Sequence, residues 1–116
     1  MSRLDSFIRR MSAQRDCLNH VADLLADVEG PVMELGLGNG RTYDHLRERL
    51  PSTRVIHVFD RYLGAHPDCV PPAERLTLGE IRETLPAFAK SGAPRAAMIH
   101  ADLGSGDPVK TRAMAD

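Results

Sequence analysis

The sequence predicts an α/β domain built on a parallel β-sheet, and three observations carry this prediction. Short apolar runs alternate along the chain with segments of helical periodicity. These runs are too continuously apolar to leave one face of a strand in water. The chain has 116 residues, which suits a single domain. Together these features predict one sheet with helices covering both of its faces.

The first stretch, residues 2–28, predicts a helix because its apolar side chains recur at steps of three, four and seven residues. Ser2 or Asp5 is expected to cap its start, and a Gly-Pro pair ends it. We interpret residues 1–30 as a helical extension whose apolar face packs on a core domain of residues 31–116. An arginine-rich start also fits a cleaved transit peptide, but Asp5 and the unbroken continuation of the helix argue against one.

The remaining elements alternate regularly after this helix. Pro86 is expected to divide the last helix, with Thr84 capping a fresh start. In chain order we expect strands near residues 32–37, 54–60, 75–78 and 96–100, and helices over residues 41–50 and 80–91.

Composition limits the classes of partner. Fifteen basic against sixteen acidic residues give a net charge of −1, which does not favour nucleic acid. No apolar run approaches the roughly 20 residues of a membrane-spanning helix. Two cysteines, Cys17 and Cys69, are too few for a disulfide framework and fit a reduced, cytoplasmic protein.

The residues that carry chemistry lie where three of the strands end. Parallel sheets bind ligands outside the carboxyl ends of their strands, so these segments are expected to meet at one edge. A glycine-rich turn lets a ligand approach the backbone, a carboxylate accepts hydrogen bonds from ribose hydroxyls, and an apolar side chain fits a flat base. In strand order the segments are Glu34, Gly36, Leu37, Gly38, Asn39 and Gly40, then Asp60, then Gly79, Glu80 and Ile81.

The spacing of the turn indicates which nucleoside ligand it binds. A dinucleotide fingerprint needs a third glycine where Arg41 stands, counting from Gly36. The turn instead reads acid-x-Gly-x-Gly-x-Gly, with Glu34 as the acid. A carboxylate there suits an ammonium group and would repel a pyrophosphate. The combination of ribose, base and amino acid predicts S-adenosylmethionine as the cofactor.

Residues 31–102 resemble the N-terminal half of class I S-adenosylmethionine-dependent methyltransferases. Residues 31–46 resemble the first motif of that family. The Arg-Glu-Thr-Leu-Pro and His-Ala-Asp-Leu-Gly segments are similar to those of a small group of bacterial methyltransferase-like proteins. The resemblance implies a Rossmann-like sheet with strand order 3-2-1-4. It also implies that the C-terminal strands of the full seven-stranded sheet are lacking, so that the sheet is truncated or completed by another chain.

The resemblance also implies roles for individual residues. Glu34 and the glycine turn would hold the methionine end, and Asp60 the ribose hydroxyls. Glu80 would contact the adenine amine and Ile81 the ring, with Arg61 and Gly79 beside them. Asp102 would lie near the reacting methyl. His100 and Asp102 are both at the end of the fourth strand, where either could orient or deprotonate an acceptor. Two such ligands do not make a metal site, so no metal is expected.

The expected function is therefore methyl transfer from S-adenosylmethionine to an acceptor, with a small molecule as the default class. Two alternatives stay open. One is a non-catalytic module that binds S-adenosylmethionine or S-adenosylhomocysteine, and the other is an NAD-binding oxidoreductase fragment. The sequence identifies no acceptor, predicts neither nucleic acid nor membrane as a partner, and leaves self-association open.

Overall fold

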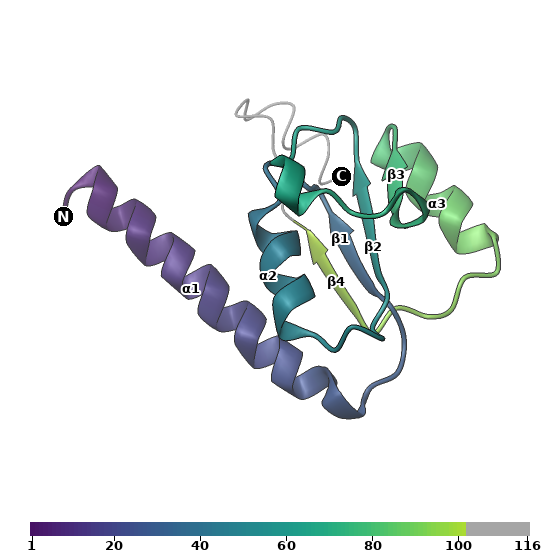
Figure 1. Cartoon of the computed structure of the whole chain (residues 1–116), viewed down its shortest axis with the longest axis horizontal. Coiled ribbons are helices and arrows are strands. Elements are labelled where there is room, and N and C mark those ends of the chain that lie inside the picture. The colour runs from purple at the N-terminus through teal and green to yellow at the C-terminus, as the bar shows by residue number, and fades with distance from the viewer. Residues whose placement is uncertain (102–116) are drawn as a thin grey trace.

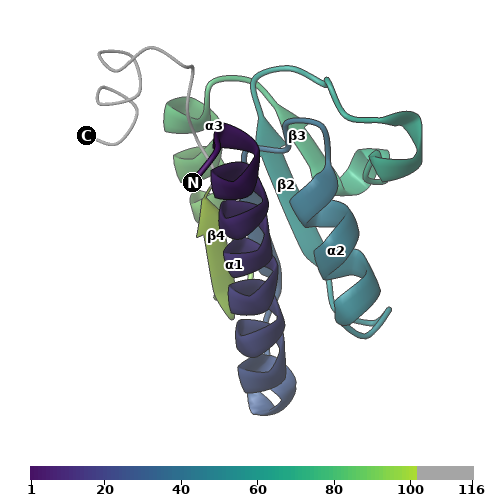
Figure 2. The same ribbon diagram turned by 90° about the vertical axis from the view of Figure 1, so that its left-hand side faces the viewer.

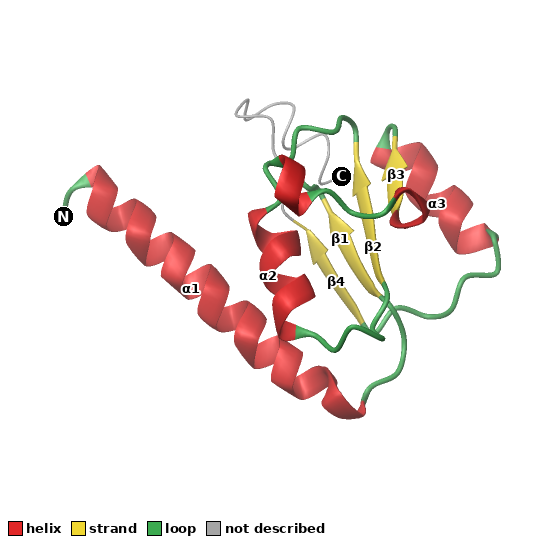
Figure 3. Ribbon diagram, viewed as in Figure 1, coloured by secondary structure: helices red, strands yellow, loops and turns green. Residues whose placement is uncertain are grey.

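The computed structural model describes residues 1–101 and contains a four-stranded, fully parallel sheet (Figures 1 and 3). Its spatial order is β3-β2-β1-β4, which confirms the predicted Rossmann-like arrangement. All four carboxyl ends therefore meet at one edge of the sheet. The strands are β1 (Val32–Leu35), β2 (Ile56–Asp60), β3 (Leu76–Leu78) and β4 (Met98–Ala101).

Helices cover both faces of this sheet (Figure 2). α1 and α2 pack on one face and α3 on the other, as the two apolar clusters described below require. Within residues 1–101, none of the helices is long and apolar enough to cross a membrane. The helices are α1 (Arg3–Leu24), α2 (Arg41–Arg49) and α3 (Ile81–Lys90). Three short 3-10 turns accompany them: η1 (Leu25–Asp27) directly after α1, and η2 (Pro67–Cys69) and η3 (Ala73–Arg75) between β2 and β3.

The core is divided by the sheet into two clusters. All four residues of β1 are buried, as expected for a central parallel strand. The cluster on the α1 and α2 face centres on Leu18, Val32, Leu46 and Val58, and the smaller one joins Met33, Leu35 and Phe59 to α3 through Ile81, Leu85 and Phe88. This packing fixes β1 and β2, whose ends carry most of the predicted site.

α1 begins as predicted and packs on the core only through its second half. Ser2 and Asp5 form a capping box at its start. Leu18 is buried, whereas Leu4 is 67% exposed, and the first half of the helix extends away from the sheet (Figure 1). The C-terminal half of α1 is anchored beside α2, where Asn19 contacts His45 and Asp23 contacts Arg49.

α3 differs from the prediction that Pro86 divides it. The helix runs unbroken from Ile81 to Lys90 with Pro86 inside it, and its N-cap is Glu80, so it does not restart at Thr84. The backbone N–H groups of Glu83 and Thr84 both donate to the Glu80 carbonyl. Pro86 lies directly after the first turn of α3 and lacks the N–H that would donate a backbone hydrogen bond there. The packing of Leu85 and Phe88 on the sheet compensates for this missing bond.

Candidate functional site

The glycine turn after β1 adopts a backbone that only glycine takes easily. Gly36, Gly38 and Gly40 have φ angles of 93°, 55° and 91°. A Cβ placed on Gly40 would lie 2.5 Å from the Cβ of Cys69, so this glycine serves close packing. A Cβ on Gly38 would meet no atom within 4 Å. The space over Gly38 is therefore an open cradle that a ligand can fill.

Asp60, at the end of β2, holds this turn in place. Its Oδ2 accepts hydrogen bonds from the backbone N–H groups of Leu37 at 2.8 Å and Gly38 at 3.1 Å. Its Oδ1 accepts one from the N–H of Arg61 at 2.7 Å. A carboxylate has about four acceptor positions, so roughly one is left for a ligand hydroxyl. The sequence indicated a ribose contact for Asp60 but not this second role in shaping the turn.

Arg61 and Glu80 form an ion pair beside Asp60, at the carboxyl edge of the sheet. The Arg61 Nε lies 2.8 Å from Glu80 Oε1, and both side chains are about half exposed. The N–H of Gly79 donates to the Asp60 carbonyl, which brings the start of α3 against the end of β2. Ile81 is half-buried against the α3-side cluster. The structure thus brings together Asp60, Arg61, Gly79, Glu80 and the turn.

Glu34 and His100 form a pair that the sequence does not reveal. They are opposite each other on the neighbouring strands β1 and β4. Glu34 is completely buried, and its Oε1 lies 2.6 Å from the Nδ1 of His100, whose side chain is 17% exposed. A contact of this length between a carboxylate and an imidazole is a strong hydrogen bond that fixes the orientation of the ring.

The residues near the turn line a cavity of about 300 Å³. One wall consists of residues 36–39 together with Arg41 and Thr42. The opposite wall comes from α1 and consists of Phe7, Met11 and Gln14. The periodicity of α1 indicated an apolar face but not what this face would meet, so α1 was not expected to contribute to the site.

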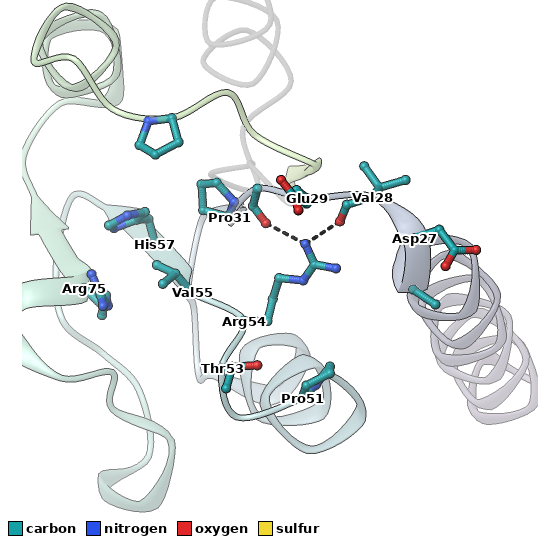
Figure 4. Close-up of a pocket in the computed structure, with 13 residues that line it drawn as sticks. Asp27, Val28, Glu29, Pro31, Pro51, Thr53, Arg54, Val55, His57 and Arg75 are labelled. Atoms are coloured by element: carbon teal, nitrogen blue, oxygen red, sulfur yellow. Dashed lines mark hydrogen bonds between the residues drawn. The ribbon is translucent and has the colours of Figure 1, made fainter.

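A larger cavity of about 790 Å³ lies at the opposite end of the strands (Figure 4). His57 and Arg75 line it, and burial together with the nearby Arg75 charge lowers the pKa of His57. Arg54 also lines it, but its guanidinium donates to the carbonyls of Leu25, Val28 and Gly30. That arginine ties the segment between α1 and β1 to the loop before β2. None of the sequence-predicted site residues that the structure describes lines this larger cavity.

Asp102 lies outside the described residues, so its position relative to His100 is not part of the site described above. Within residues 1–101, no three His, Cys, Asp or Glu side chains are grouped closely enough to hold a metal ion. Cys17 and Cys69 are both free thiols.

Similarity to known proteins identifies the family of this chain. Residues 1–116 match the model of a family described as S-adenosyl-L-methionine methyltransferase. The chain belongs to this S-adenosyl-L-methionine methyltransferase family. A crystal structure of an S-adenosyl-L-methionine methyl transferase from Silicibacter pomeroyi is 50% identical in sequence with a TM-score of 0.88, covering 99% of this chain and 70% of that one. None of the functionally curated proteins is similar enough to this methyltransferase family member to count as a match.

Membership of the family confirms the resemblance seen in the sequence and implies S-adenosylmethionine as the cofactor. The open cradle over Gly38 fits that group, because the bare backbone accepts a ligand where any side chain would protrude. The roles of individual residues in binding and catalysis remain predictions.

Proposed function

We propose that this chain binds S-adenosylmethionine at the carboxyl edge of its sheet and transfers the methyl group to a small-molecule acceptor. The observation that supports this most is the turn at Gly38, which is open to solvent, lacks a side chain and borders a cavity. The family match makes S-adenosylmethionine the ligand of choice for that cavity. The bound sulfonium would supply an activated methyl group.

The chain's own residues would position this ligand. The backbone of residues 36–40 would contact its amino-acid end, and the remaining acceptor position of Asp60 would take a ribose hydroxyl. Glu80 and Ile81 would contact the adenine, with Arg61 holding Glu80 in place through their ion pair. Because Asp60 ties the turn to β2, loss of its carboxylate would weaken binding through both the ribose contact and the shape of the turn.

His100 and Asp102 are the candidates for orienting or deprotonating the acceptor. Glu34, which was expected to meet the cofactor's ammonium, is buried and bonded to His100 instead of lining the cavity at the turn. We therefore assign Glu34 to holding the imidazole of His100 in one orientation. Its contact with the ammonium stays a prediction from the sequence.

Calorimetric titration tests the proposal. S-adenosylhomocysteine is expected to bind and NAD is not. Asp60→Ala should weaken S-adenosylhomocysteine at least tenfold, about 1.4 kcal/mol. Binding of NAD alone would overturn the proposal. Incubation with methyl-labelled S-adenosylmethionine and a panel of small acceptors tests transfer, and cofactor binding without any transfer would favour the non-catalytic module.

A further inference from the structure

The charge of the cavity beside the turn points to an anionic group in its ligand. Of the side chains that line it, Arg41 is the one cation and none is a carboxylate. Arg41 is the first residue of α2, where the free N–H groups of the helix start add further positive potential. Its own N–H donates to the side-chain oxygen of Asn39 at 3.3 Å, which fixes the backbone at this position.

Among residues 1–101, no ion pair occupies the Arg41 guanidinium, so it is available to a ligand. Ion pairs among residues 1–101 engage the neighbouring Arg47 with Asp44 and Arg49 with Asp23, but none involves Arg41. Arg41 is exposed and lines the cavity at the turn. An exposed guanidinium beside a cavity without acids would prefer a carboxylate as its partner.

The facing wall on α1 supplies complementary groups. Gln14 and Met11 are half-buried, and Phe7 lies one turn further toward the N-terminus. The Gln14 amide can donate to a carboxylate oxygen, and the apolar Met11 and Phe7 suit an alkyl chain. α1 is held beside α2 by an ion pair between Arg49 and Asp23 and by a 2.6 Å hydrogen bond between His45 and Asn19.

From this arrangement we propose that Arg41 and Gln14 bind the carboxylate of the cofactor's amino-acid end, so that α1 forms part of the cofactor site. The inference rests on the proposed function and specifies how that site recognises its ligand. The alkyl chain between carboxylate and sulfur then lies against Met11 and Phe7. The region treated as a helical extension thus contributes directly to cofactor affinity.

A ligand that lacks only the carboxylate provides the test. Wild type and Arg41→Ala are titrated with S-adenosylhomocysteine and with its decarboxylated analogue, which keeps the amine. Arg41→Ala should bind S-adenosylhomocysteine about tenfold more weakly, or about 1.4 kcal/mol, and the analogue within about twofold of wild type. Arg41→Lys, which keeps the charge, should recover part of the loss. Gln14→Ala should show the same selectivity with a loss of about threefold.

Arg9→Ala is the matched control, because Arg9 is an exposed arginine on α1 that does not line the cavity. It should bind both ligands as wild type does. Equal losses for both ligands in Arg41→Ala, or no loss for either, would overturn the inference while leaving the proposed function intact. An unchanged Gln14→Ala would remove α1 from the site. Failure of the wild type to bind S-adenosylhomocysteine would overturn the proposed function as well.

Discussion

Replacing Gly38 with alanine separates the ligand-binding role of the turn from its structural role. Gly38 has a φ of 55°, in the left-handed region, and an added Cβ would meet no protein atom within 4 Å. The protein itself therefore has room for the methyl group. A ligand that lies against the turn does not, because the methyl would occupy the space over the backbone.

The expected cost to folding follows from the backbone alone. A left-handed alanine costs about 1–2 kcal/mol relative to glycine. The unfolded chain loses freedom when glycine is replaced, which offsets about 0.4–1 kcal/mol of that cost. The net loss in free energy of unfolding should be about 1 kcal/mol, or roughly 4 °C in Tm for a domain of this size.

Gly92→Ala is a matched control for this experiment. Gly92 has a φ of 83°, and a Cβ there also meets nothing within 4 Å, but it follows α3 and is remote from the turn in sequence. Urea unfolding should show similar losses for both variants. Calorimetry should show a loss of S-adenosylhomocysteine affinity of more than tenfold, above about 1.4 kcal/mol, in Gly38→Ala only.

Wild-type affinity in Gly38→Ala would refute the reasoning, because the cradle would then not be in contact with the ligand. A loss in Gly92→Ala as large as that in Gly38→Ala would also refute it. In that case the effect would come from general destabilisation rather than from the space over the turn.

Three further predictions concern the fold around the site. Leu46→Ala should lower the free energy of unfolding by about 3 kcal/mol because Leu46 is fully buried, whereas Ile99→Ala, at 58% exposure, should cost less than about 1 kcal/mol in the same urea titration; equal losses would contradict the assignment of the core. Glu34→Gln should cost about 2 kcal/mol by weakening the bond to His100, and the same change should cost less when His100 is already alanine; an additive double-mutant cycle would count against the pair. Burial and the nearby Arg75 charge lower the pKa of His57 in the folded protein, so His57 binds a proton more readily in the unfolded chain than in the folded one. The stability of the wild type should therefore fall as pH drops below about 6.5, and His57→Phe should reduce this fall; an unchanged pH dependence would contradict it.

The parts of the fold that the sequence predicts are those that depend on local pattern. The strands that end at Leu35 and Asp60 are mostly apolar, and the alternate glycines 36, 38 and 40 all have positive φ angles. Because parallel strands end at one edge, this was enough to bring Asp60 and the turn together. Strand order followed from the family resemblance and not from the pattern itself.

The parts that the sequence does not predict depend on register and on helix direction. The bond between Glu34 and His100 joins residues 66 positions apart and needs the pairing of β1 with β4 to be known. The hydrogen bonds from the turn to the Asp60 carboxylate likewise join residues 22 and 23 positions apart. The unbroken path of α3 through Pro86 depends on tertiary packing, which outweighs one missing backbone bond.

The contribution of α1 was missed for a related reason. Its apolar stripe indicates a packed face, but the stripe does not show that Met11 and Gln14 pass beside the turn while Leu18 reaches the core. Gln14, a polar side chain between Met11 and Leu18 on that stripe, is the signal in the sequence that points to this wall. The direction in which α1 passes α2 determines which of its side chains face the turn, and only the structure shows this direction.

Amide chemical shifts during a titration with S-adenosylhomocysteine show at which end of the sheet the ligand binds. We expect the largest changes on the N–H groups of Leu37, Gly38 and Asn39 and on residues that follow β2. Changes confined to the opposite end of the strands, around Arg54 and His57, would contradict it, because the ligand would then occupy the other cavity.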